Sequence, residues 1–229
     1  MDQTPASRLA VIAALRAVIP DDVALAGGRI GEVTSPLFAE ETVAVQRAVE
    51  KRRREFTAGR QYARSAMSQL GMRPAAITIL PSRAPNWPRG LTGSISHSGD
   101  ACVAVVAADS EFIGVGIDIE LASPLPAELY ATVCSSSELS SATYRVDQAK
   151  MLFVVKEAFF KLYHPLTGYF LDFLDVTVRL DFALGAFSLE LREGPPSVLG
   201  MRVFNGVCGH VGEYCFAFVA LRTCEFGQK

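Results

Sequence analysis

The sequence has no segment suited to crossing a membrane and no clear export signal. Its most apolar stretches, residues 101–108 and 214–221, are far shorter than the roughly 20 residues of a membrane-spanning helix. Asp2 stands near the start, and Arg8 and Arg16 interrupt the first apolar stretch, whereas a signal peptide has a basic start and an unbroken apolar centre. We therefore expect a cytoplasmic protein with no membrane partner.

Cysteine pairs and an excess of positive charge are also missing. The five cysteines form an odd set without a C-x-x-C pair, which favours reduced thiols over a disulfide framework or a zinc knuckle. The 22 Lys and Arg residues are balanced by 24 Asp and Glu residues, giving a net charge of −2. Because the chain lacks a general basic field, we expect no nucleic-acid partner.

Apolar residues make up half of the 229-residue chain, which is enough for a sizeable core. Periodicity predicts helices and strands in an order that occurs twice, helices first and strands after them, with a division near residues 110–125. We therefore expect an α+β fold, and the order suggests two related halves. The helices are expected at 5–19, 40–70 and 147–163, and the strands at 101–108, 112–120, 174–180, 186–192, 199–204 and 214–221.

Punctuating residues set several expected boundaries. Gly59 is a candidate interruption of the second helix, and Pro165 is expected to end the third. Ser135 and Glu138 match the S-x-x-E capping box, which predicts that a short helix begins here. Residues 21–38 and 73–93 are rich in Gly or Pro and are expected to form loops with short extended pieces.

An acidic pair lies in the segment G-V-G-I-D-I-E, residues 114–120. On a strand, Asp118 and Glu120 share a face with Gly114 and Gly116, while the aliphatic residues point to the core. Two neighbouring carboxylates repel each other unless a cation lies between them, and Mg²⁺ prefers such oxygen ligands. The glycines would leave space for a ligand. A solvated acidic strand end is the other interpretation of this pattern.

Charged groups also share one face of the apolar helix at 147–163. Glu157 and Lys161 are four residues apart, Lys150 continues their stripe, and Lys156 is rotated away from it. The helix is unusually apolar for one in solvent, which favours a cleft. A surface stripe with an ordinary ion pair is the alternative.

Two further segments are suited to phosphate. Ser96 and His97 lie among small residues at the end of a short strand, where amides, hydroxyls and the imidazole could bind phosphate oxygens. Arg53, Arg60 and Arg64 fall within one arc of an unbroken helix, and Arg52 could join them if Gly59 breaks that helix. Clustered guanidinium groups bind phosphate well. A hydrogen-bonded loop histidine and a solvated basic helix face are the alternatives.

Four segments together resemble a known family. The motifs R-R-x-E-F-x-x-x-R, W-P-x-G-x-x-G-S-I-S-H, G-V-G-I-D-I-E and V-K-E-A-F-F-K, in this order and spacing, are similar to those of the 4′-phosphopantetheinyl transferases. The closest subgroup is the Sfp-like one related to enterobactin synthetase component D. The resemblance covers roughly residues 52–175.

The resemblance implies a fold, a reaction and its partners. Two similar α+β halves, residues 1–113 and 114–229, would pack about a pseudo-twofold axis as a monomer, with coenzyme A in the cleft between them. The enzyme would move the 4′-phosphopantetheine group of coenzyme A to a serine of an apo acyl or peptidyl carrier protein. Adenosine 3′,5′-bisphosphate would be released.

The resemblance also assigns roles to single residues. Asp118, Glu120 and Glu157 would hold Mg²⁺, with Mn²⁺ as the alternative, against the coenzyme A pyrophosphate. Glu157 or a metal-bound water would take the serine proton, and Lys161 would neutralise the phosphate. The remaining contacts with coenzyme A would come from Arg52, Arg60, Ser96 and His97, with Lys156 in a less defined role.

One turn departs from the family pattern. Related proteins often carry a lysine-containing, glycine-rich turn before the W-P dipeptide, whereas residues 79–85 contain no lysine here. Arg83 is the candidate replacement near the nucleotide. Two other functions also fit the acidic cluster: a metal-dependent phosphohydrolase that uses water as nucleophile, and a non-catalytic coenzyme A binding module.

Overall fold

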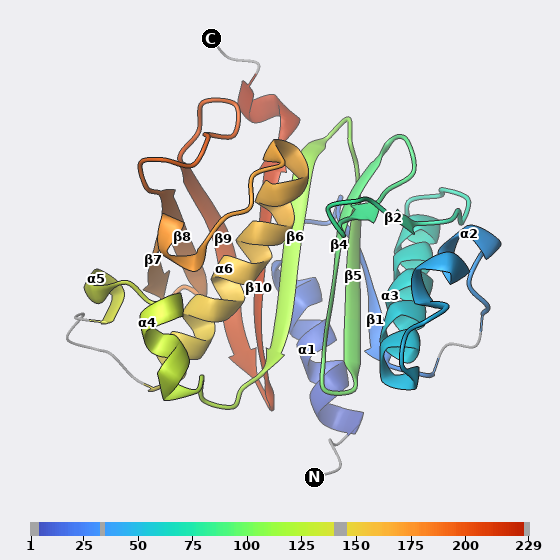
Figure 1. Ribbon diagram of the computed structural model, residues 1–229, viewed down its shortest axis with the longest axis horizontal. Helices are drawn as coiled ribbons and strands as arrows, with labels where there is room; N and C mark the ends of the chain where they lie inside the picture. The colour runs from blue at the N-terminus through green and yellow to red at the C-terminus, as the bar shows by residue number, and fades with distance from the viewer. Residues whose placement is uncertain (1–4, 33–34, 140–145, 227–229) are drawn as a thin grey trace.

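The computed structural model describes residues 5–32, 35–139 and 146–226 as two main sheets with helices on both faces and a small two-stranded sheet (Figure 1). The first part of the chain forms α1 (Pro5–Val18), β1 (Ala24–Arg29), α2 (Ala39–Thr42), α3 (Glu50–Gln69), β2 (Thr78–Ile79), β3 (Pro85–Asn86), β4 (Leu91–Ser98) and β5 (Ala101–Ala108). The second part forms β6 (Phe112–Leu121), α4 (Tyr130–Val133), α5 (Ser136–Leu139), α6 (Val146–Thr167), β7 (Val176–Asp181), β8 (Ala186–Leu191), β9 (Val203–Val211) and β10 (Tyr214–Arg222). The α+β prediction is therefore confirmed.

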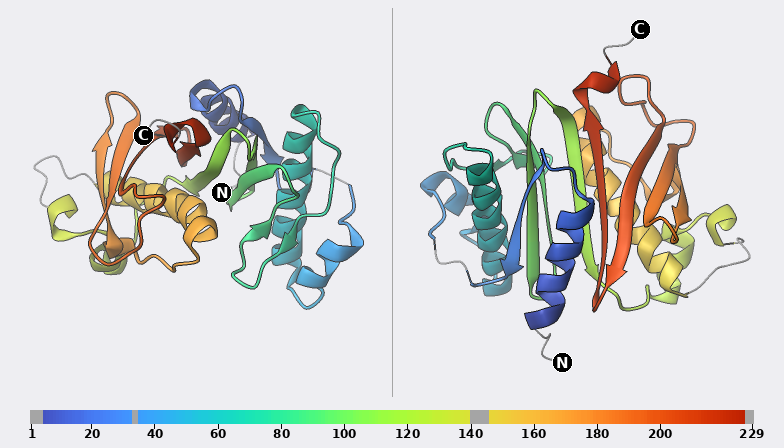
Figure 2. Two further views of the ribbon diagram at one scale, coloured as in Figure 1. Left: turned by 90° about the horizontal axis from the view of Figure 1, so that it is seen from above. Right: turned by 180° about the vertical axis from the view of Figure 1, so that it is seen from behind.

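The two main sheets meet along β4 and β6. One sheet has the order β1-β5-β4 and the other β6-β10-β9-β8-β7, each antiparallel throughout. Helices α3 and α6 cover the front of their sheets, whereas α1 lies behind and contacts β1, β9 and β10 (Figure 2). The front helices therefore flank the line along which the two sheets meet.

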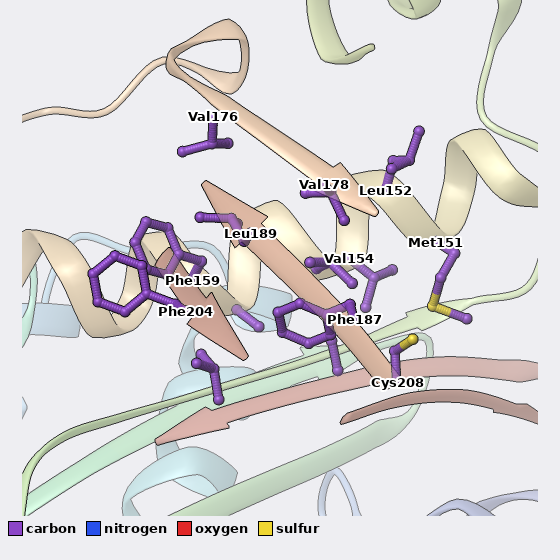
Figure 3. Packing of buried hydrophobic residues seen from close by; sticks show 14 of the residues in the cluster. Met151, Leu152, Val154, Phe159, Val176, Val178, Phe187, Leu189, Phe204 and Cys208 are labelled. Atoms are coloured by element: carbon purple, nitrogen blue, oxygen red, sulfur yellow. The ribbon is translucent and has the colours of Figure 1, made fainter. Parts of the chain in front are cut away.

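Each front helix has its own core. Helix α6 packs on the five-stranded sheet, where the rings of Phe159 and Phe204 lie 4.7 Å apart next to Phe187 and Leu189 (Figure 3). Helix α3 packs on β1, β4 and β5 around Met67. A third core behind the sheets joins α1 to both of them. The alternation expected for β6 is confirmed, because its aliphatic residues at 115, 117 and 119 are buried in this third core.

A buried glutamate is bound in the same way in both parts of the chain. In the first part, Glu41 on α2 accepts hydrogen bonds from the backbone of Phe38 and Ile77 and forms an ion pair with Arg64 on α3. These contacts fix the short helix to the long helix and to the chain entering β2. Charge and hydrogen bonds are both satisfied, as a buried carboxylate requires.

The second part repeats this arrangement with different residues. Glu138 on α5 accepts hydrogen bonds from the backbone of Ser135 and Val178 and from the ammonium group of Lys156 on α6. The capping box predicted at Ser135 is confirmed, because the Glu138 amide donates to its hydroxyl at 3.3 Å. The recurrence supports the proposal of two related halves, whose symmetry axis stays a prediction. The proposed boundary at 113/114 falls inside β6.

Several expected element boundaries were wrong. Gly59 does not interrupt α3, which is continuous from Glu50 to Gln69. The glycine instead lets the helix approach β4 closely, since an added Cβ would lie 2.9 Å from Ile95 Cγ2. The chain before Glu50 forms α2 and a 3₁₀ turn instead of a continuous helix. Pro165 lies within the last turn of α6, and residues 203–211 form β9 where 199–204 had been expected. Within the described ranges, no helix combines the length and apolarity needed to span a membrane.

Candidate active site

A cleft of about 280 Å³ opens between α3 and α6, above the line where β4 meets β6. Its wall includes side chains from both front helices, both strands and the turn at residues 79–87. Seven charged or titratable residues that line it come from distant parts of the sequence: Arg52, Glu55, Arg60, Arg83, His97, Lys161 and His164.

Serine hydroxyls join β4 to β6. The backbone amides of Ile117, Ile119 and Leu121 donate to the hydroxyls of the serines at positions 94, 96 and 98, at 3.1, 3.2 and 3.1 Å. The partner number rises by two at each step, so the two strands run parallel. Serine hydroxyls thus accept the hydrogen bonds that backbone carbonyls accept in a regular sheet. The backbones of β4 and β6 are therefore held farther apart than neighbouring strands of one sheet.

Asp118 on β6 is 4% exposed and lies beside the cleft, where it contacts the lining residue Lys161. Its Oδ1 accepts two hydrogen bonds of 2.7 Å, one from the hydroxyl of Ser96 on β4 and one from the ammonium group of Lys161 on α6. Its Oδ2 is buried and has no hydrogen-bond partner among the described residues. An unpaired carboxylate oxygen in such a position is energetically costly, so it points to a ligand.

Two more carboxylates, those of Glu120 and Glu157, act in the neighbourhood of Asp118. Glu120 accepts a 3.0 Å hydrogen bond from Ser98 and lies 3.4 Å from the ammonium group of Lys150. On α6, burial raises the pKa of Glu157, and the negative charges of Asp118 and Glu120 raise it further against the opposing effect of Lys161. The predicted stripe on α6 therefore faces the predicted acidic pair on β6.

The donor set fits a divalent cation, although the side chains do not enclose a site for one. Within ranges 5–32, 35–139 and 146–226, no three His, Cys, Asp or Glu side chains lie close enough to hold a metal ion together. Asp118 nevertheless keeps one oxygen without a partner, and burial and the neighbouring carboxylates raise the pKa of Glu157. Mg²⁺ binds through one or two carboxylates plus water and phosphate, so these oxygens suit it.

The charged side chains that line the cleft itself are mainly basic. Arg52 lies 3.4 Å from Nε2 of His97, and both are within 4.0 Å of Glu55. Burial lowers the pKa of His97, an effect that Glu55 opposes. Burial also lowers the pKa of Arg60 to about 10. A buried guanidinium group with so little compensating charge is suited to receive an anion.

The structure separates Arg52 from its neighbour Arg53. Arg53 donates to the carbonyls of Val45 and Gln46 at 3.1 and 2.7 Å, which fixes the chain before α3. Arg52 lines the cleft instead. Arg83 also lines it and has a positive φ of 69°, in a turn closed by its amide on the carbonyl of Leu80.

Three expectations about this site need correction. Lys156 is not available to coenzyme A, because its ammonium group donates to Glu138 and to two backbone carbonyls and is 2% exposed. Ser96 is 3% exposed and donates its only hydroxyl proton to Asp118, so it is not free to bind phosphate. Gly116 leaves no ligand space, since a Cβ there would lie 2.0 Å from the carbonyl oxygen of Ala158.

Glu55 and Trp87 are two cleft residues that the motifs alone did not single out. Both stand inside the quoted motifs and line the cleft. Trp87 covers Gly93 so closely that a Cβ on this glycine would lie 2.6 Å from the indole ring. The W-P-x-G-x-x-G spacing therefore contained a signal for an aromatic wall, but only the tertiary structure shows which surface it lines.

Family models match both parts of the chain. The model of the 4′-phosphopantetheinyl transferase N-terminal domain matches residues 39–107, and that of the 4′-phosphopantetheinyl transferase superfamily matches residues 114–219. The 4′-phosphopantetheinyl transferase Svp of Streptomyces mobaraensis is 38% identical over 177 residues, which cover 74% of this chain and 71% of that protein. The chain belongs to the 4′-phosphopantetheinyl transferase superfamily. The family resemblance and the prediction of a transferase are thereby confirmed.

Other phosphopantetheinyl transferases extend the comparison. The 4′-phosphopantetheinyl transferase Npt of Nocardia iowensis is 35% identical over 151 residues, or 65% of this chain and 68% of that protein. Enterobactin synthase component D of Salmonella typhi is 38% identical over 93 residues, or 40% of this chain and 38% of that protein. The subgroup named from the motifs is therefore among the relatives.

Proposed function

We propose that this protein transfers the 4′-phosphopantetheine group of coenzyme A to a serine hydroxyl of an apo acyl or peptidyl carrier protein. The observation that carries the proposal is the buried, unpartnered Oδ2 of Asp118 next to a cleft with a basic wall, which the Asp118 partner Lys161 lines. A pyrophosphate with its cation matches this pairing of charges, since the cation meets the carboxylates and the phosphates meet the cationic side chains.

Coenzyme A would be held by the basic wall. Arg52 and Arg60, on one face of α3, are suited to its 3′-phosphate, and Arg83 lies on the adjoining turn. His97 and Lys161 lie nearer the acidic cluster and are suited to the pyrophosphate. Guanidinium groups bind phosphate through paired hydrogen bonds, which favours Arg for the terminal phosphate.

Asp118, Glu120 and Glu157 would hold Mg²⁺, with Mn²⁺ as the alternative. When bound, the cation stabilises the charge that develops on the transferred phosphoryl group. Asp118 offers its free oxygen, and Lys161 keeps the other oxygen in place through the 2.7 Å contact. This assignment rests on the donor set and on the family resemblance.

Glu157 would accept the proton of the carrier serine. A carboxylate whose pKa is raised by burial and by Asp118 is a stronger base than an exposed one. The serine oxygen forms a bond to the β-phosphorus while the bond from that phosphorus to the bridging oxygen breaks. Lys161 would neutralise the leaving adenosine 3′,5′-bisphosphate.

Incubation with coenzyme A, Mg²⁺ and an apo carrier protein tests the proposal. A mass gain of one phosphopantetheine on the carrier supports transfer. Cleavage of coenzyme A without a carrier supports the phosphohydrolase, and binding without turnover supports the binding module. Asp118→Ala should abolish transfer, and near-parental activity of this variant would overturn the carboxylate assignment.

The nucleotide contacts need a separate measurement. Arg60→Ala should weaken binding of coenzyme A more than binding of 3′-dephospho-coenzyme A, because only the former carries the phosphate assigned to Arg60. Titration calorimetry with both ligands measures the difference. Equal losses would remove Arg60 from the 3′-phosphate site. Gel filtration with light scattering tests the proposed monomer.

A further inference from the structure

We propose that Ser96 and Ser98 are positioning residues that hold the metal-binding carboxylates of Asp118 and Glu120. The inference rests on the proposed function, because it assigns these carboxylates to a cation. Each serine extends from β4 to β6 and contacts the strand at two points, one backbone amide and one carboxylate. The two strands would thus be joined by the same hydroxyls that orient the site.

The hydrogen-bond capacity of a hydroxyl explains this double role. A serine hydroxyl has one proton to donate and lone pairs to accept with. Ser96 accepts from the amide of Ile119 at 3.2 Å and donates to Oδ1 of Asp118 at 2.7 Å. The amide belongs to the residue directly after the carboxylate. Ser96 therefore holds both the backbone and the side chain of one short segment of β6.

Ser98 repeats the pattern two residues along the strand. It accepts from the amide of Leu121 at 3.1 Å and donates to Oε2 of Glu120 at 3.0 Å. The spacing of two on each strand places both hydroxyls on the same face as both carboxylates. Ser96 and Ser98 of β4 are thus paired in order with Asp118 and Glu120 of β6.

Ser94 provides a control inside the protein. Its hydroxyl accepts from the amide of Ile117 at 3.1 Å, as the other two serines do on their partners. The residue before Ile117 is Gly116, which has no carboxylate. Ser94 therefore shares the backbone contact between the strands and lacks the contact with an acidic group.

Positioning matters here because Asp118 has two oxygens in different situations. Its Oδ1 is bound by Ser96 and Lys161, which fixes the carboxylate plane and leaves Oδ2 without a partner. Groups that orient metal ligands typically contribute 10- to 100-fold to metal affinity. A phosphate contact of Ser96 would instead require its only proton to leave Asp118.

The test compares Ser94→Ala, Ser96→Ala and Ser98→Ala. Binding of Mn²⁺ alone is measured by electron paramagnetic resonance, and stability by urea denaturation. All three variants should lose stability, because each leaves one β6 amide without its acceptor. Only Ser96→Ala and Ser98→Ala should bind Mn²⁺ more weakly, by about 10-fold or more. The partly buried Ser98 also allows Ser98→Thr, which should restore the affinity.

Two outcomes would overturn the inference. One is an equal loss of Mn²⁺ affinity in Ser94→Ala and Ser96→Ala, since the serines would then act only through the backbone. The other is parental affinity in all three variants.

In the assay with coenzyme A, Ser96→Ala should raise the KM for Mg²⁺ while kcat at saturating Mg²⁺ falls much less.

A further measurement separates this inference from the proposed function. If the parent neither binds Mn²⁺ nor modifies a carrier, the proposed function fails, and the serine contacts are tested through stability alone. Ser96→Ala and Asp118→Asn should then be non-additive in urea denaturation, by at least about threefold in the unfolding equilibrium constant. Ser94→Ala with Asp118→Asn should be additive. Additivity in both pairs would overturn the positioning role.

Discussion

Gly116→Ala is the most direct test of how α6 is held against the cleft. Gly116 lies on β6 under α6, and an added Cβ would lie 2.0 Å from the carbonyl oxygen of Ala158. That oxygen belongs to the helix backbone, so it cannot rotate away. Ala158 directly follows Glu157 and lies three residues before Lys161, so the helix segment that must move contains both of these site residues.

The size of the effect follows from this distance. Real Cβ atoms essentially never lie closer than 3.0 Å to another heavy atom. Because the added Cβ would start 2.0 Å from the Ala158 oxygen, α6 must move away from β6 by about 1 Å. Overpacking of this kind costs about 1–3 kcal/mol, which lowers the melting temperature by about 2–12 °C in a chain of this size. A displacement of about 1 Å in catalytic groups can cost about 100-fold in activity.

Gly114→Ala is the matched control on the same face of β6. Its Cβ would lie 3.2 Å from Leu166 Cδ1, the end of a flexible side chain. We expect a stability change within about 0.5 kcal/mol and nearly parental transfer. Urea denaturation and carrier modification measure both effects. If Gly116→Ala matched Gly114→Ala in stability and activity, the close helix–strand contact would not position the site.

Three further predictions follow from other contacts. Lys156→Met should cost about 3–5 kcal/mol in urea denaturation, because it leaves a buried carboxylate unpaired; a smaller loss than about 1 kcal/mol would contradict the buried ion pair. Arg52→Ala should weaken coenzyme A binding in calorimetry with little change in stability, whereas Arg53→Ala should lower stability by about 1–2 kcal/mol with less effect on binding; the reverse pattern would exchange their roles. At pH 8, iodoacetamide should modify exposed Cys224 first, whereas Cys102 stays protected in the folded protein, since burial raises the pKa of its thiol to about 12 and keeps it protonated. Rapid labelling of Cys102 in peptide mass spectra would contradict its burial.

Local periodicity was enough to predict which side chains share a face. The alternation along β6 separates Ile117 from Asp118, and the helical spacing of four places Glu157 with Lys161. Both patterns depend only on the geometry of a single element. They hold in the structure, where β6 buries its aliphatic face and directs its acidic face toward α6.

Some predictions failed because the sequence does not show how a side chain's hydrogen bonds are used. Lys156 stands inside a family motif, yet its ammonium group is fully occupied by Glu138 and two carbonyls. Ser96 is similarly bound to Asp118. A motif specifies residue types and spacing, but availability for a ligand depends on partners more than 15 positions away.

The long helices, the apolar core and the acidic and basic motifs were therefore determined by the sequence itself, since they follow from local periodicity and residue chemistry. Only the tertiary structure decided that serines of β4 bind the carboxylates of β6, that Arg52 and not Arg53 reaches the cleft, and that Gly116 serves helix packing. These outcomes depend on the distances between elements, and packing of the whole chain fixes those distances.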